Sequence, residues 1–144
     1  MKVVFDTSVL VAGIVEAHPL HERSLPWLRK ARAGSLDYLV GAHSLAELYA
    51  VLSALPTSPR IGARLAWRLI RENVEAHARV VTLSAGDYTR VIGALADREM
   101  PGGIVYDALI VKAAQKARAD KLLTLNPRDF LRIWPEGDAV IASP

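Results

Sequence analysis

A chain of 144 residues, 51% of them hydrophobic and 23% charged, has the length and composition of one globular domain, which we expect to span residues 1–144. The lack of cysteine excludes disulfides and thiolate metal sites, and it suits a cytoplasmic protein. Neither a secretion signal nor a membrane span is expected, and the net charge of +3 is compatible with a polyanionic partner without indicating one.

Apolar runs typical of buried strands alternate with helical patterns along the chain. In chain order we expect a strand at 2–6, helices at 7–16 and 19–33, a strand at 38–40, helices at 44–55 and 60–76, a strand at 80–83, helices at 85–98 and 104–119, a strand at 122–125, a short helical turn opened by Asn126 and Pro127, and a weak strand within 139–142. This alternation predicts an α/β fold of three layers, α/β/α, with a central parallel sheet. Functional sites of such sheets lie at the carboxyl ends of the strands.

Four acidic residues fall where the carboxyl ends of these strands would meet. Asp6 ends the first strand, and Glu47 lies in the first turn of the helix after the second strand. Asp107 lies at the start of the helix that runs antiparallel to the fourth strand, and Asp129 follows that strand. If the first and fourth strands are neighbours, Asp6 and Asp129 lie one strand apart, roughly 5 Å laterally.

Each acid also has an ordinary structural interpretation. Asp6 could cap the first helix, and Asp107 could favour a helix dipole. The segment Ser44-Leu-Ala-Glu47 matches a capping box, and Asn126-Pro-Arg-Asp129 resembles a cap followed by a first-turn proline and acid. The segment Ser84-Ala-Gly-Asp87 has the same signature, but we assign it no chemistry because its strand is expected at the edge of the sheet.

The joint occurrence of the acids indicates a metal site more strongly than any one of them. Asp6 and Asp107 stand in the apolar contexts VVFD and IVYDALI, where clustered carboxylates repel one another and their pKa values rise. A divalent cation reverses this cost, and Mg²⁺ and Mn²⁺ prefer oxygen ligands. No cysteine, His-x-x-x-His pair or phosphate-binding glycine loop competes for the catalytic role.

The chain resembles the PIN-domain ribonucleases and, within them, the VapC-type toxins of toxin–antitoxin pairs. The matching stretches are FDTSVLVAG, SLAELYAVL, YDALIVKAA and LLTLNPRDF, which contain the four acids in the order of the family, and HPLHERS also looks like this group. The resemblance implies a PIN-like fold with a five-stranded parallel sheet. It also implies an endoribonuclease that depends on Mg²⁺ or Mn²⁺.

The resemblance assigns roles to these acids. It implies that Asp6 and Asp107 bind the metal directly and that Glu47 binds it either directly or through a water molecule. Asp129 would be the fourth acid, although the fourth acid varies in this family and Asn126 is the alternative.

Neighbouring residues would support such a site. Ser8 and Thr124 are predicted to orient the carboxylates, since such ligands need hydrogen-bond partners. Arg128, beside the predicted acidic cleft, is a candidate contact for a substrate phosphate. The mechanism that we expect is hydrolysis of an RNA phosphodiester by water, because no side chain stands out as a protein nucleophile.

The resemblance further implies a homodimer and a cognate VapB-type antitoxin, which would occlude the site and couple the pair to operator DNA. Two alternatives remain open from the sequence. A phosphatase with Asp6 as nucleophile is disfavoured because FDTSV has no second aspartate two residues later. A non-catalytic PIN-like module that binds RNA or protein would be expected to have a broken set of acids.

Overall fold

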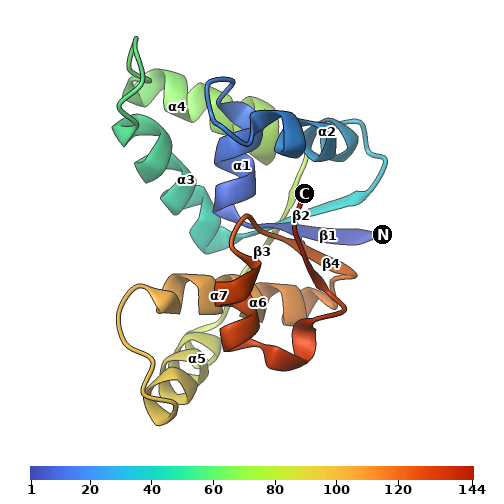
Figure 1. Ribbon diagram of the computed structural model, residues 1–144, viewed down its shortest axis with the longest axis vertical. Helices are drawn as coiled ribbons and strands as arrows, with labels where there is room; N and C mark the ends of the chain where they lie inside the picture. The colour runs from blue at the N-terminus through green and yellow to red at the C-terminus, as the bar shows by residue number, and fades with distance from the viewer.

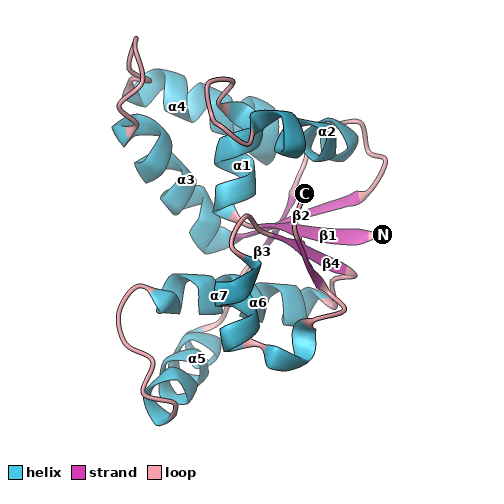
Figure 2. Cartoon of the chain, in the orientation of Figure 1, coloured by secondary structure: helices cyan, strands magenta, loops and turns pink.

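The computed structural model describes residues 1–144 and contains one five-stranded parallel sheet in the order β3-β2-β1-β4-β5. The strands are β1 (Lys2–Phe5), β2 (Asp37–Gly41), β3 (Arg79–Val81), β4 (Lys121–Leu123) and β5 (Ile141–Ala142). Figure 2 shows the strands at the centre with helices on both sides. The predicted three-layer α/β/α fold is confirmed, including the position of β3 at an edge.

Helices α1 to α4 form one outer layer, whereas α6 and α7 form the other, with α5 packed outside α6 (Figure 1). Their bounds are α1 (Thr7–Ile14), α2 (His21–Arg32), α3 (Ala42–Ala54), α4 (Ala63–Ile70), α5 (Ala85–Asp97), α6 (Ile104–Ala117) and α7 (Pro127–Ile133). No helix is both long enough and apolar enough to cross a membrane.

Strand β1 is buried on both faces, as expected for the central strand of a parallel sheet. Its side chains alternate, so that Val3 and Phe5 pack in the core beneath α1–α4 and Val4 packs in the core beneath α6 and α7. The ring of Phe5 meets the ring of Tyr38 on β2 edge to face, with centroids 4.8 Å apart. The apolar run at the N-terminus therefore joins two cores and fixes the position of the residue that follows it.

The helix expected at 60–76 differs from the observed structure at both of its ends. Gly62 precedes α4, and residues Arg71–Glu75 form a π-helical turn. Within this turn the side chain of Asn73 donates to the carbonyl oxygen of Leu69 at 2.8 Å and accepts from Arg32 at 3.1 Å. Side-chain bonds of this kind compete with the regular helical ladder. The other predicted boundaries lie within two residues of the observed ones.

The strand order places a switch point between β1 and β4. From β1 the chain moves outward to β2 and β3, and it then returns to build β4 and β5 on the opposite side of β1. Phe5 is in register with Leu123, so Asp6 and Thr124 leave the sheet side by side. The backbone amide of Asp6 donates to the carbonyl oxygen of Leu123 at 2.9 Å. These two positions lie at the end of the sheet where such folds bind ligands.

Candidate active site

The carboxylate of Asp6 is buried and held by two hydroxyl groups. Ser8 Oγ and Thr124 Oγ1 donate to its Oδ2 atom at 2.6 Å and 2.8 Å. Asp6 occupies the N-cap position of α1, but its side chain makes no capping bond, so capping does not account for the carboxylate. Burial raises the pKa of Asp6 above its ordinary value, the hydroxyl donors partly oppose this, and the charge of Glu47 raises it further.

The same hydroxyl groups join the two chain segments that leave the sheet. Ser8 Oγ accepts from the backbone amide of Leu125 at 3.1 Å, and Thr124 Oγ1 accepts from the amide of Asn126 at 3.0 Å. Ser8 and Thr124 therefore lie where the sequence predicted them, in contact with Asp6. Their bonds fix the orientation of that carboxylate relative to β4.

Three of the four acids line one pocket of about 250 Å³ at the carboxyl edge of the sheet. The acids are Asp6, Glu47 and Asp107, and the wall is completed by Thr7, Ser8, Val11, His18, Val51 and Asn126. The structure brings these three acids together from the end of β1, from α3 and from α6, whereas Asp129, the fourth acid expected at this edge, does not line the pocket. The pocket lies at the switch point between β1 and β4.

Helix α3 begins two residues earlier than expected, so Glu47 lies in its second turn and not in the first turn as predicted. Gly41 precedes the helix, so Ser44 is an interior residue, fully buried and without a hydrogen bond. The capping box expected at Ser44 and Glu47 is therefore wrong. The equivalent pattern at Ser84 is a real capping box, in which Asp87 N donates to Ser84 Oγ at 3.1 Å and Ser84 N donates to Asp87 Oδ2 at 2.9 Å.

Asp107 lies in the first turn of α6 and is half-buried. Burial, followed by the charges of Asp6, Glu47 and Asp129, raises the pKa of Asp107 to about 7. Asp129, in the first turn of α7, is exposed and does not line the pocket, although its charge acts on Asp107. Asn126 does line the pocket, and its side chain makes no capping bond to α7.

The negative charge of this cluster has no lysine or arginine partner. The only ion pair that involves any of the four acids joins Glu47 to His43, at 3.2 Å. No three acidic or histidine side chains are close enough to hold an ion by direct ligation alone. A magnesium ion needs only one or two direct carboxylates because it keeps several waters, so this donor set of oxygens fits a hydrated divalent cation.

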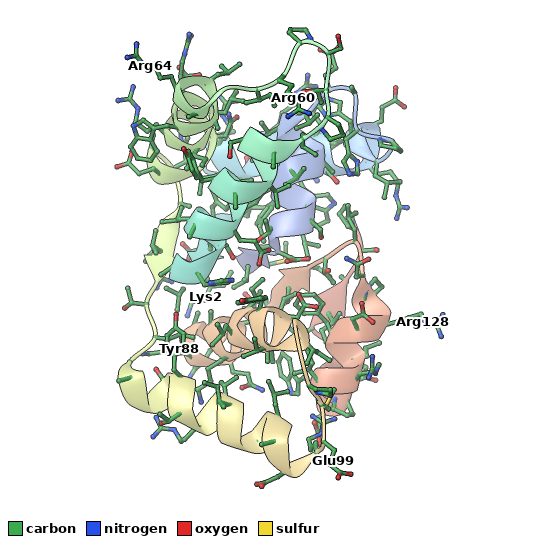
Figure 3. The ribbon with its side chains drawn as sticks, turned by 90° about the vertical axis from the view of Figure 1, so that its left-hand side faces the viewer. Lys2, Arg60, Arg64, Tyr88, Glu99 and Arg128 are labelled. Atoms are coloured by element: carbon green, nitrogen blue, oxygen red, sulfur yellow. The ribbon has the colours of Figure 1, made fainter.

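Arg128 does not lie over the acids. Its side chain is exposed, makes no hydrogen bond or ion pair within the protein, and extends outward from α7 (Figure 3). The suggested contact between Arg128 and a substrate phosphate therefore requires a substrate that extends well beyond the pocket.

Comparisons with known proteins decide the family. A model of the PIN domain matches residues 3–133. The chain belongs to the PIN-domain family. Ribonuclease VapC27 of Mycobacterium tuberculosis is 36% identical over 115 residues, which cover 80% of this chain and 78% of that protein. Ribonuclease VapC40 of the same species is 34% identical over 123 residues, which cover 85% of each.

A solved structure agrees with the fold of this PIN domain. The crystal structure of VapBC2 from Rickettsia felis, bound to a DNA fragment from its promoter, matches with a TM-score of 0.68. The match covers 100% of this chain and 99% of that one at 19% identity, so it supports the fold alone. The resemblance to VapC-type PIN domains that the sequence motifs indicated is confirmed by the sequence relatives.

Sequence reasoning missed several residues around the site of this PIN domain. Thr7 and His18 line the acidic pocket, and the Nδ1 atom of His18 accepts from the backbone amide of Leu20 at 3.0 Å. His43 pairs with Glu47, and its ring stacks on that of Tyr106. The spacing of four residues between His43 and Glu47 on one helix was a usable signal, whereas the others required the fold.

Replacing Thr124 with valine should destabilise this PIN domain. The change keeps the shape of the side chain but removes a donor to the buried carboxylate of Asp6 and an acceptor for the amide of Asn126. We expect the free energy of unfolding to fall by about 1–3 kcal/mol at neutral pH. Urea denaturation of the variant beside Ser143→Ala, which removes a hydroxyl bond to the Thr124 carbonyl oxygen away from Asp6, would measure it. Equal stability of Thr124→Val and wild type would show that Asp6 does not depend on this bond.

Proposed function

We propose that this PIN domain is a metal-dependent endoribonuclease that acts as the toxin of a VapBC-type toxin–antitoxin pair. The observation that carries the proposal is a pocket at the switch point of the sheet that three carboxylates line without a lysine or arginine partner. The sequence relatives support it, because both are named as VapC ribonucleases.

We assign the binding of Mg²⁺ or Mn²⁺ to Asp6 and Asp107, with Glu47 acting directly or through water. Asn126 lines the pocket and Asp129 does not, so we assign the completion of the site to Asn126, with Asp129 adding negative charge that acts on Asp107. Such an ion, when bound, lowers the pKa of a water molecule and neutralises charge on phosphoryl oxygens.

The protein side chains set up this site in two ways. Ser8 and Thr124 hold the Asp6 carboxylate in one orientation, so that a ligand finds it preorganised. The pKa of Asp107 is about 7 without a cation, so binding of a cation near neutral pH would release the proton of this carboxyl group. Attack on the phosphorus by water, with the leaving oxygen opposite to it, would then hydrolyse the phosphodiester bond.

The proposed partners are RNA as substrate, a VapB-type antitoxin and a second copy of the chain in a homodimer. Support for the antitoxin comes from the fold neighbour, which was solved as VapBC2 with promoter DNA. We propose that this chain meets operator DNA only through its antitoxin.

Incubation of the purified chain with total RNA tests the function. We expect discrete fragments with Mg²⁺ or Mn²⁺ and none with EDTA. Each cut should leave a phosphate monoester on one fragment and a hydroxyl on the other, because water rather than the ribose 2′-hydroxyl is the nucleophile. Cleavage that persists in EDTA, or cyclic phosphate ends, would contradict the proposal, and RNA binding without cleavage would favour a non-catalytic PIN-like module.

A further inference from the structure

A second hollow adjoins the acidic pocket. It has a volume of about 290 Å³ and is lined by His43, Ala46, Glu47, Ala50 and Tyr106. The side chain of Glu47 belongs to the walls of both hollows. Whatever occupies the second hollow therefore lies beside whatever occupies the first.

One wall of this hollow is a pair of stacked rings. The ring of His43 on α3 lies parallel to that of Tyr106 on α6, with centroids 5.0 Å apart and planes inclined by 5°. The Nε2 atom of His43 lies 3.2 Å from Oε2 of Glu47, which holds the imidazole in place. The side chain of Tyr106 makes no hydrogen bond, and the residue is 49% exposed, so it offers aromatic surface to solvent directly before Asp107 in the chain.

The rest of the hollow is lined mostly by small side chains on the same face of α3 as His43. Ala46 and Ala50 lie one turn apart on α3 and present only methyl groups. An aromatic wall beside small apolar side chains leaves room for a flat ring to stack on it. The volume is at the lower end of the range for ligand sites, which suits a single ring system better than an extended cofactor.

We propose that this hollow binds one unpaired nucleobase of RNA, adjacent to the phosphate that enters the acidic pocket. The inference rests on the proposed function and extends it to substrate recognition by a single-stranded segment. Proteins recognise single-stranded RNA by stacking unpaired bases on tyrosine, histidine and similar side chains. Because Glu47 forms a wall of both hollows, a base here and a phosphate there belong to one continuous strand.

The inference is tested with two fluorescent single-stranded oligoribonucleotides of the same length. One consists of adenosine, and the other has abasic sugars in place of the nucleosides. Both are measured by anisotropy in an Asp107→Asn background, which we expect to leave the RNA intact. The adenosine strand should bind about 5- to 100-fold more tightly than the abasic strand. This preference should persist in Tyr106→Phe, which keeps the ring, and disappear in Tyr106→Leu.

Tyr88→Leu is the matched control, since Tyr88 is also exposed but lies on α5 and lines neither hollow (Figure 3). It should keep the preference for bases. Equal affinity for the two strands, or an unchanged preference in Tyr106→Leu, would overturn the inference. So would a change of mass in light scattering specific to Tyr106→Leu, because it would identify the rings as a contact between copies of the chain.

The binding assay is independent of cleavage, so the two proposals fail separately. A wild-type chain that cleaves total RNA with metal but shows no preference for bases would overturn the base site and leave the nuclease. A chain that prefers bases but never cleaves would retain the base site and overturn the nuclease.

Discussion

Asparagine in place of Asp107 should reduce metal-dependent cleavage of RNA by at least about 100-fold while the protein stays folded. Loss of a residue that only orients a metal ligand typically costs 10- to 100-fold, so loss of a proposed ligand should cost at least the upper value. The substitution keeps the size of the side chain on α6 and removes a charge that neighbouring acids repel. Initial rates on total RNA under excess Mg²⁺, with circular dichroism as the test of folding, would measure the effect.

Asp87→Asn is the matched control because Asp87 is also a first-turn aspartate. It caps α5 through Ser84 and pairs with Lys116 at 3.0 Å, and these contacts hold the pKa of Asp87 well below its usual range. Its stabilising charge is present at neutral pH and is lost only in strong acid, so the variant should melt at a lower temperature near pH 7 but cleave RNA normally. An equal loss of cleavage in both variants would contradict the assignment of Asp107 to the site.

The stability of wild type relative to Asp107→Asn should fall as the pH rises and increase when Mg²⁺ is added. Folding raises the pKa of Asp107 from 3.8 to about 7. Its ionisation therefore leaves the free energy of unfolding unchanged at pH values below 3.8 and lowers it by the full penalty at pH values above about 7. Because Asp107 is only half-buried and solvent screens its charge, we expect a penalty of about 1–2 kcal/mol. The variant should therefore be more stable than wild type at about pH 8 and equal to it at the acidic end.

Added Mg²⁺ should offset this difference, because the cation binds the ionised wild type more tightly than the variant and therefore stabilises it more. At a concentration of 100 times the dissociation constant, binding to the folded state contributes about 2.7 kcal/mol. Thermal melts of both proteins across this pH range, with Mg²⁺ and with EDTA, would measure both effects. A wild type whose melting temperature rises with pH relative to the variant in EDTA would contradict the sign derived for Asp107.

The sequence predicted the sheet and the convergence of the acids because both follow from strong local patterns. The short, β-branched apolar run before Asp6 is typical of a buried strand. The chain direction of a parallel sheet then brings Asp6, Glu47 and Asp107 to one edge. Where local patterns competed, prediction failed. The motif at Ser44 matches a capping box as well as that at Ser84 does, and only the start of α3 at Ala42 separates them.

Other parts of the site depend on contacts between distant segments, which no local pattern contains. Tyr106 stacks on a ring 63 positions earlier in the chain, and His18 enters the pocket from the loop between α1 and α2. The choice between Asn126 and Asp129 likewise depends on the direction in which α7 leaves β4, which places Asn126 and not Asp129 in the pocket wall.

Titration of the purified protein with Mn²⁺, followed by the electron paramagnetic resonance signal of the free ion, tests the central claim most directly because it needs no knowledge of the RNA. We predict saturable binding by wild type at about pH 8, binding at least about tenfold weaker in Asp107→Asn, and unchanged binding in Asp87→Asn. A wild type that does not bind Mn²⁺, or an Asp107→Asn variant that binds it equally well, would contradict the assignment of the acidic pocket as a metal site.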